Sequence, residues 1–260
     1  MLEHALEKFS PTMICDYMSC PRSFYYKYIA KVEIPQKKIH LLFGGGVHAG
    51  IEGIYHKQDP YPFFEKHFVQ DKLMSDEQDK FKEYYDLGHE MIKNYAEQHD
   101  TLDNLYKLND GISEKYIKRH LINPLTGETS TLPMAGRIDR LTNGGKIIEY
   151  KTAKAKWNPK DMAFKTQTFL YNLWYYSEYG EMPNETLYFI LLKKYKKDIR
   201  NGETLQVLNH RCTLTDLAIV FDEIEIIIQK INNREFNRPL GFHPMWCDCH
   251  LYEKFLNLNM

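Results

Sequence analysis

The feature that most constrains this chain is a pair of short alternating runs joined by Asn143–Gly145, a combination typical of a tight β-hairpin. The length of the loop decides which side chains share a face. A two-residue loop would place Asp139 and Glu149 on opposite faces of the sheet. A three-residue loop, with a glycine in the left-handed conformation, pairs Thr142 with Lys146. We predict the three-residue loop because it gathers the polar side chains on one face.

With that register, Asp139 lies directly across from Glu149, and Lys151 follows on the same face. The other face then carries the apolar residues Ile138, Ile148 and Tyr150. Two carboxylates that face each other repel and destabilise a strand pair by up to about 1 kcal/mol. A divalent cation between them reverses the sign of that interaction, so the hairpin predicts a metal site with a lysine beside it.

Two sequence motifs of this hairpin resemble the core of the PD-(D/E)xK nuclease superfamily. They are G-R-I-D-R over 136–140 and E-Y-K-T over 149–152. Both motifs look like those of the RecB-type and Cas4-type exonuclease branch of this superfamily. The resemblance implies an α/β, restriction-endonuclease-like fold, with a mixed central sheet flanked by helices. It also implies a nuclease that uses Mg²⁺ or Mn²⁺.

A glycine-rich run, F-G-G-G-V-H over 43–48, precedes the hairpin and predicts the tight start of a helix that packs closely on its neighbours. A lone histidine is more often structural than a ligand. However, G-x-x-x-H ahead of the hairpin resembles the first motif of the same nuclease branch, which implies that His48 binds the catalytic metal. Glu114, in a predicted strand before the hairpin, is a second-tier acidic candidate or a plain surface glutamate.

Residues after the hairpin supply the candidates for DNA binding. A helix is predicted from Asn158-Pro159 to Tyr179, and its Q-x-x-x-Y pair resembles the fourth motif of the nuclease branch. The alternative makes the tyrosine a core residue. A buried strand over 187–192 is followed by a lysine cluster that provides a local phosphate-contact patch. The candidate DNA-binding residues are Gln167, Tyr171, Lys193, Lys194, Lys196 and Lys197.

Cysteines near the two ends suggest a metal that joins the termini. The run Y-M-S-C-P-R-S-F-Y-Y-K-Y over 17–28 resembles the opening of the same nuclease branch, which implies that Cys20 is the first ligand of an iron–sulfur cluster. Cys247 and Cys249 lie near the C-terminus. The C-x-C spacing departs from the relatives, in which the C-terminal part supplies three cysteines. The fourth ligand of a [4Fe-4S] or zinc site would come from His250, His243, Cys15 or Cys212. The other alternative is a chain that has lost the cluster and keeps the thiols.

Composition narrows the class of protein. The formal net charge is −1, whereas a protein that coats DNA non-specifically usually has a positive net charge. Any nucleic-acid-binding surface must therefore be a local patch of basic residues. No long apolar run and no signal peptide are present, so we expect a cytoplasmic protein of a bacterium or of a phage in a bacterial host, away from membranes. The chain has no phosphate-binding loop, so a helicase or recombination partner would be a separate polypeptide. Nothing in the pattern indicates an oligomer.

We expect a single nuclease domain over 1–260, with a helical insertion over 58–108 and a terminal subdomain formed by 1–30 and 241–260. The predicted function is a metal-dependent DNA nuclease, an exonuclease that acts on DNA ends. His48, Asp139, Glu149 and the carbonyl of Tyr150 would hold the metal, and Lys151 would orient the attacking water. The alternatives are a structure-specific endonuclease on the same fold or a non-catalytic DNA-binding module.

Overall fold

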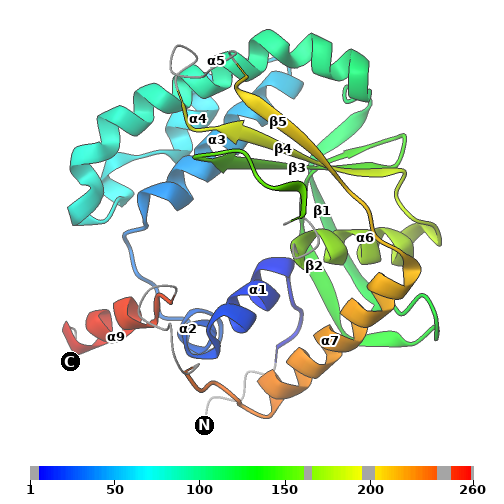
Figure 1. Ribbon diagram of the computed structural model, residues 1–260. Helices are drawn as coiled ribbons and strands as arrows, with labels where there is room; N and C mark the ends of the chain where they lie inside the picture. Colours follow the sequence, from blue (N-terminus) through cyan, green and yellow to red (C-terminus); the bar gives the residue numbers. More distant parts are fainter. Residues whose placement is uncertain (1–5, 161–165, 195–202, 239–246, 259–260) are drawn as a thin grey trace.

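A mixed β-sheet forms the centre of the protein (Figure 1). The computed structural model describes residues 6–160, 166–194, 203–238 and 247–258. Within these ranges one five-stranded sheet has the order β1-β2-β3-β4-β5, and its strands are β1 (Gly111–Ile122), β2 (Thr129–Thr142), β3 (Lys146–Ala153), β4 (Glu185–Leu192) and β5 (Leu205–His210). β3 and β4 run parallel, and the other neighbouring strands are antiparallel. The predicted α/β class with a mixed central sheet is confirmed.

Helices cover both faces of the sheet (Figure 1). One apolar core joins the sheet to the helices that precede it in sequence, α3 (Ile39–Tyr55), α4 (Tyr61–His67) and α5 (Phe81–Tyr106), with two short 3-10 turns, η2 (Gln70–Lys72) and η3 (Ser75–Lys80). A second core lies under α6 (Thr166–Tyr179) and α7 (Leu214–Asn232). All the secondary-structure elements within residues 58–108 are thus helices. That this segment is an insertion into the nuclease fold stays a prediction.

The hairpin between β2 and β3 has the predicted register. Arg140 pairs with Ile148 and Leu141 with Ile147, so the next pair toward the turn is Thr142 with Lys146. The third loop residue, Gly145, has a φ of 73°, in the left-handed region that favours glycine. Away from the turn the regular pairing of β2 with β3 ends at Arg140 and Ile148, and the N–H of Tyr150 then donates to Oδ2 of Asp139 at 2.7 Å, which holds Asp139 beside Glu149. The three-residue loop is therefore confirmed.

The predicted apolar face of this hairpin is wrong in one residue. Ile148 and Tyr150 pack in the core beneath α3 and α5, whereas Ile138 packs in the core beneath α6 and α7. The β1–β2 ladder lacks a pair between Glu114 and Asp139, where Glu114 has a φ of 49°. Simple alternation of side chains fails at this irregularity, and Ile138 falls on the other side.

The glycine-rich run also differs from expectation. It lies within α3, which already begins at Ile39, rather than at the start of a helix. The prediction of close packing is confirmed, because a Cβ added at Gly46 would lie 2.9 Å from the Phe64 ring and one at Gly50 would lie 2.5 Å from Ile92. These glycines bring α3 close to α4 and α5, and they set the position of His48 on the same helix.

The two ends of the chain meet beside the main core. Ser10 caps α1 (Pro11–Ser19), and Cys20 connects it to α2 (Pro21–Phe24), which continues as the π-helical turn η1 (Tyr25–Ile29). The C-terminal helix α9 (Cys249–Leu258) packs against this region, with Tyr26 and Tyr252 stacked at 5.7 Å between ring centroids. The assignment of 1–30 and 241–260 to one subdomain stays a prediction. No helix in the described ranges is long and apolar enough to cross a bilayer.

Candidate active site

The hairpin places three polar residues together at the middle of the sheet. The Lys151 Nζ atom lies 3.1 Å from Oε2 of Glu149, two residues earlier on β3. The backbone N–H of Tyr150 donates a hydrogen bond of 2.7 Å to Oδ2 of Asp139 on β2. This side-chain bond ties the two strands together beyond the last regular ladder pair. Both carboxylates are therefore held by contacts from β3 itself.

The Glu149 carboxylate is fully buried, and its Oε1 atom has no hydrogen-bond partner among the described residues. Burial, together with the Asp139 charge, raises the pKa of Glu149 to about 8. Burial alone would lower the pKa of Lys151, but the Glu149 and Asp139 carboxylates outweigh it and raise that pKa. An unpartnered, buried carboxylate oxygen beside a second carboxylate suits a divalent cation that prefers oxygen ligands.

His48 approaches the same carboxylates from α3. Its Nδ1 atom lies 3.6 Å from Oδ2 of Asp139, and its side chain is about a quarter exposed, at 23%. Burial opposes protonation of this ring, but the Asp139 carboxylate dominates and raises the His48 pKa. The structure thus brings His48, Asp139, Glu149 and Lys151 to one place, from three elements of the fold.

Glu114 lies beside this group on β1. Together with His48, Asp139 and Glu52, it lines a small cavity. Burial raises the Glu114 pKa, and the charges of Asp139 and Glu52 add to that rise. The second-tier acidic candidate is therefore adjacent to the site rather than on a distant surface.

The two residues of the Q-x-x-x-Y pair, Gln167 and Tyr171, lie in different environments. Tyr171 is buried, and its hydroxyl donates to the carbonyl oxygen of Arg137 at 2.6 Å and accepts from Nε2 of Gln167 at 3.2 Å. The Tyr171 side chain thus holds β2 two residues before Asp139, and Gln167 is the more accessible member. After β4, Lys193 is half-buried with Nζ 5.1 Å from the Phe43 ring centroid, and Lys194 is exposed. Lys196 and Lys197 lie outside the described residues.

Two features near the site escaped the sequence analysis. The hydroxyl groups of Tyr55, Tyr95 and Tyr150 are hydrogen-bonded to one another behind the site. The buried Arg140 guanidinium lies over the Tyr55 ring, with its carbon 3.8 Å from the ring centroid. The available signal was the spacing of Tyr55, seven residues after His48 and so on the same helical face.

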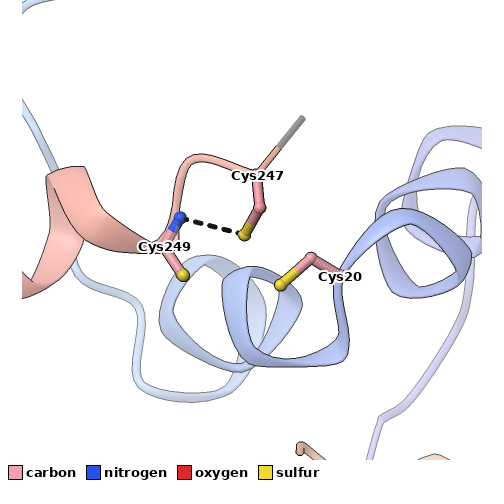
Figure 2. A group of neighbouring side chains, drawn as sticks. All are labelled: Cys20, Cys247 and Cys249. Carbon is pink, nitrogen blue, oxygen red and sulfur yellow. Dashed lines mark hydrogen bonds between the residues drawn. The ribbon is translucent and has the colours of Figure 1, made fainter. Parts of the chain in front are cut away.

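Three cysteines, one near the N-terminus and two near the C-terminus, form a second group of candidate ligands (Figure 2). The sulfur atoms of Cys20, Cys247 and Cys249 lie within 4.8 Å of one another, and all three residues are buried. Burial, followed by a hydrogen bond with Cys20, raises the pKa of the Cys247 thiol. A compact set of buried thiols fits a soft or borderline metal such as zinc or iron.

No fourth ligand joins this group within the described ranges. The His250 ring is turned to the Cys247 carbonyl oxygen, with Nδ1 at 2.9 Å. Cys15 lies instead beside the Gln167 backbone, and Cys212 lines a separate cavity next to His210. His243 is outside the described residues.

Comparisons with known proteins agree with this geometry. The family model for the PD-(D/E)XK nuclease superfamily matches residues 8–250. No curated protein matches the chain. The crystal structure named "Putative exonuclease" from Eubacterium rectale has a TM-score of 0.55 at 13% identity, covering 94% of this chain and 86% of that chain. A structure of SSO0001 has a TM-score of 0.31 at 12% identity, covering 83% and 87%.

At such identities the structural likeness shows the fold alone. The family match spans almost the whole chain, including the histidine helix, the hairpin and the terminal cysteines. Placement in the RecB-type or Cas4-type branch stays a prediction. Nucleases of this superfamily hydrolyse phosphodiester bonds of nucleic acids and generally use divalent metals. The chain belongs to the PD-(D/E)XK nuclease superfamily.

Proposed function

We propose that this protein is a metal-dependent DNA nuclease that acts as an exonuclease on DNA ends. The observation that carries the proposal is the buried Glu149 carboxylate, which faces Asp139, contacts Lys151 and keeps one oxygen without a protein partner in the described structure. A core residue of no function would rarely keep a carboxylate in this state, because burying an unsatisfied charged group is costly.

His48, Asp139, Glu149 and the Tyr150 carbonyl would hold Mg²⁺ or Mn²⁺. Oxygen ligands suit both ions, and the histidine favours Mn²⁺. When bound, such an ion neutralises charge on the scissile phosphate and acidifies a water molecule. The Tyr150 N–H keeps the Asp139 carboxylate aimed at the site through their 2.7 Å bond. Glu114, which lines the same small cavity as His48 and Asp139, remains a second-tier acidic candidate at the edge of the site.

Lys151 would orient the attacking water and stabilise the phosphate. Its raised pKa keeps the side chain as an ammonium, which donates to Glu149 in the resting site. In the reaction the attacking water gives up one proton and its oxygen forms a bond to phosphorus, the bond from phosphorus to the leaving oxygen breaks, and the leaving oxygen takes up one proton. An ammonium beside the phosphate stabilises the negative charge that develops.

The DNA strand would be positioned by Gln167, Lys193 and Lys194, with Tyr171 acting through the backbone of β2. Lys196 and Lys197 would extend the phosphate contacts. Exonuclease action is supported by the name of the E. rectale neighbour and by the resemblance of the motifs to the exonuclease branch. A structure-specific endonuclease and a non-catalytic binding module are the competing functions, and the full Asp139, Glu149 and Lys151 set argues against the latter.

The terminal cysteines would hold a structural metal, zinc or a [4Fe-4S] cluster. Three sulfurs within 4.8 Å support this part of the proposal. Such a site would tie α9 to α1 and α2 and so stabilise the ends of the chain.

One experiment separates the functions. End-labelled linear DNA, single- and double-stranded, is incubated beside closed circular DNA with Mg²⁺, Mn²⁺ or EDTA. Metal-dependent loss of linear DNA by the wild type, absent in Lys151→Ala, supports the exonuclease, and the order of label loss reports its polarity. Cleavage of the circle indicates an endonuclease. DNA binding in a gel shift without cleavage under any metal contradicts the proposal.

A further inference from the structure

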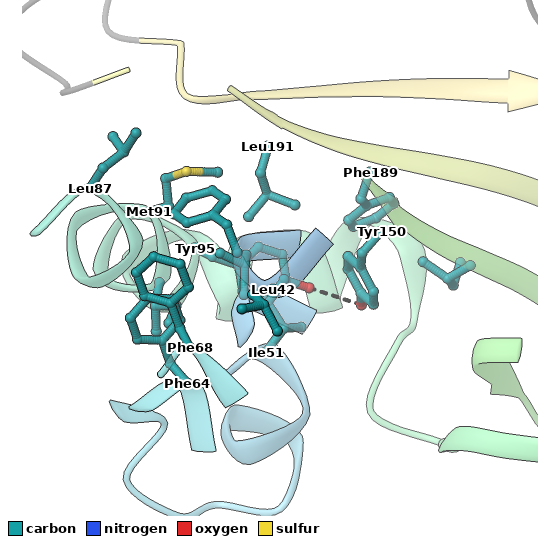
Figure 3. Close-up of a cluster of buried hydrophobic side chains, with 14 of the residues drawn as sticks. Leu42, Ile51, Phe64, Phe68, Leu87, Met91, Tyr95, Tyr150, Phe189 and Leu191 are labelled. Carbon is teal, nitrogen blue, oxygen red and sulfur yellow. Dashed lines mark hydrogen bonds between the residues drawn. The ribbon is translucent and has the colours of Figure 1, made fainter. Parts of the chain in front are cut away.

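Three buried or half-buried tyrosines form a closed ring of hydrogen bonds behind the catalytic strand. The hydroxyl oxygens of Tyr55 and Tyr95 are 2.7 Å apart, those of Tyr55 and Tyr150 are 2.9 Å apart, and those of Tyr95 and Tyr150 are 3.1 Å apart. Figure 3 shows the contact between Tyr95 and Tyr150 within the core. Each hydroxyl can donate once and accept at least once, so the ring satisfies all three. We call it the tyrosine triangle.

The triangle connects the elements that carry the proposed metal ligands. Tyr55 lies on α3, two helical turns after His48 and on the same face. Tyr150 lies on β3 between Glu149 and Lys151, so its ring points to the side opposite these two. Its backbone N–H is the group that holds Asp139. The bond between Tyr55 and Tyr150 therefore links the helix that carries His48 to the strand that carries Glu149.

Arg140 adds the remaining strand to this arrangement. Its guanidinium lies over the Tyr55 ring and donates to the Leu108 carbonyl oxygen at 2.6 Å and to Oγ of Ser113 at 2.8 Å. Arg140 follows Asp139 directly on β2, so the cation–π contact anchors that strand to α3. Tyr95 lies on α5, a helix that carries no proposed metal ligand. Its hydroxyl forms hydrogen bonds with the hydroxyls of both Tyr55 and Tyr150.

We propose that the Tyr55–Tyr150 hydrogen bond, supported by Tyr95 and Arg140, is a positioning device that holds His48 at the correct distance from Asp139 and Glu149 for divalent metal binding. This inference rests on the proposed nuclease site. Partners that orient metal ligands typically change metal affinity 10- to 100-fold when removed. The hydroxyl groups of Tyr55 and Tyr150 act as positioning groups, because they bond to each other and to Tyr95. The backbone carbonyl of Tyr150 is separately one of the proposed metal ligands.

The geometry predicts an order of effects among tyrosine-to-phenylalanine variants. Tyr150→Phe and Tyr55→Phe each break the link between α3 and β3, but leave the other two hydroxyls bonded to each other. Tyr95→Phe leaves the 2.9 Å bond between Tyr55 and Tyr150 in place. Tyr84→Phe serves as a matched control, because Tyr84 packs against the same core and forms no hydroxyl hydrogen bond among the described residues.

The test measures Mn²⁺ binding to DNA-free protein by electron paramagnetic resonance, together with thermal unfolding in EDTA. We expect Tyr55→Phe and Tyr150→Phe to raise the Mn²⁺ dissociation constant about tenfold or more. Tyr95→Phe should bind Mn²⁺ more tightly than Tyr55→Phe or Tyr150→Phe does. Its unfolding temperature should nevertheless fall by about as much as theirs. In cleavage assays, the two link variants should need more Mn²⁺ for half-maximal rate and should recover most activity when the metal is in excess.

Two results would overturn the inference while leaving the nuclease site intact. In the first, both link variants bind Mn²⁺ as tightly as wild type, while Glu149→Gln loses binding. In the second, Tyr95→Phe loses as much affinity as the link variants, which would indicate general loosening of the core. If Tyr150→Phe does not fold, Tyr55→Phe carries the test alone. Wild-type protein that neither binds Mn²⁺ nor cleaves DNA would instead overturn the proposed function, and the inference with it.

Discussion

The ammonium of Lys151 contacts one oxygen of the Glu149 carboxylate at 3.1 Å, while the second oxygen of that carboxylate is buried without a protein partner in the described structure. The lysine is the only cation that this carboxylate contacts within the described ranges. The remaining oxygen of Glu149, Oε1, is therefore the atom that would bind the proposed metal. The same contact holds the ammonium beside the proposed metal site, where its proposed role is to stabilise the phosphate and orient the water.

Replacing Lys151 by alanine should lower the cleavage rate by about a hundredfold or more, because general acid–base and charge-stabilising groups contribute on this order. Lys151→Arg should not restore the rate, since a planar guanidinium cannot replace a compact ammonium at this position. Initial rates on linear DNA at saturating Mn²⁺ measure the effect. Lys194→Ala, at an exposed lysine, is the control and should mainly weaken DNA binding. A Lys151→Ala rate within tenfold of wild type would refute the assignment.

The stability of the metal-free protein should fall as the pH rises from about 5 to about 8. Burial and the Asp139 charge raise the pKa of Glu149 to about 8 from its usual value of 4.5, so in this window the folded state holds a proton that the unfolded state has released. The free energy of unfolding then decreases with pH. Thermal unfolding in EDTA, compared with Glu149→Gln, checks this. The variant should show a flatter profile, and parallel profiles would contradict the burial of an ionisable group.

Loss of a terminal cysteine should release a bound metal. Protein purified without oxygen and analysed for iron and zinc should contain one of these metals, and Cys20→Ala or Cys249→Ala should abolish the binding. A cluster would also give a brown colour with visible absorbance. Cys212→Ala is the matched control, because that thiol lies outside the group of three sulfurs. Wild-type protein without iron or zinc would exclude the terminal metal site.

Adjacent glycines of α3 should respond in opposite directions to alanine. A Cβ at Gly45 meets nothing within 4 Å, so Gly45→Ala should stabilise the helix by about 0.5–1 kcal/mol. A Cβ at Gly46 would lie 2.9 Å from the Phe64 ring and 3.3 Å from its backbone oxygen, so Gly46→Ala should destabilise the protein by about 1–3 kcal/mol. Chemical denaturation of the two variants measures both effects. Equal stabilities would show that α3 does not approach α4 this closely.

Much of the local structure followed from the sequence. The Asn143–Gly145 loop determined the register of the hairpin next to the turn, because a turn acts over a few adjacent residues. The mixed sheet flanked by helices followed from the family resemblance.

Tertiary packing decided the rest, because it depends on contacts between residues far apart in the chain. The side on which Ile138 packs depends on the irregular β1–β2 pairing at Glu114, and this pairing leaves no local pattern. The burial of Tyr171 and its bond to Arg137 arise from how α6 lies on β2. The tyrosine triangle joins residues 40 to 95 positions apart, so only the packing of α3, α5 and β3 could bring their hydroxyls together.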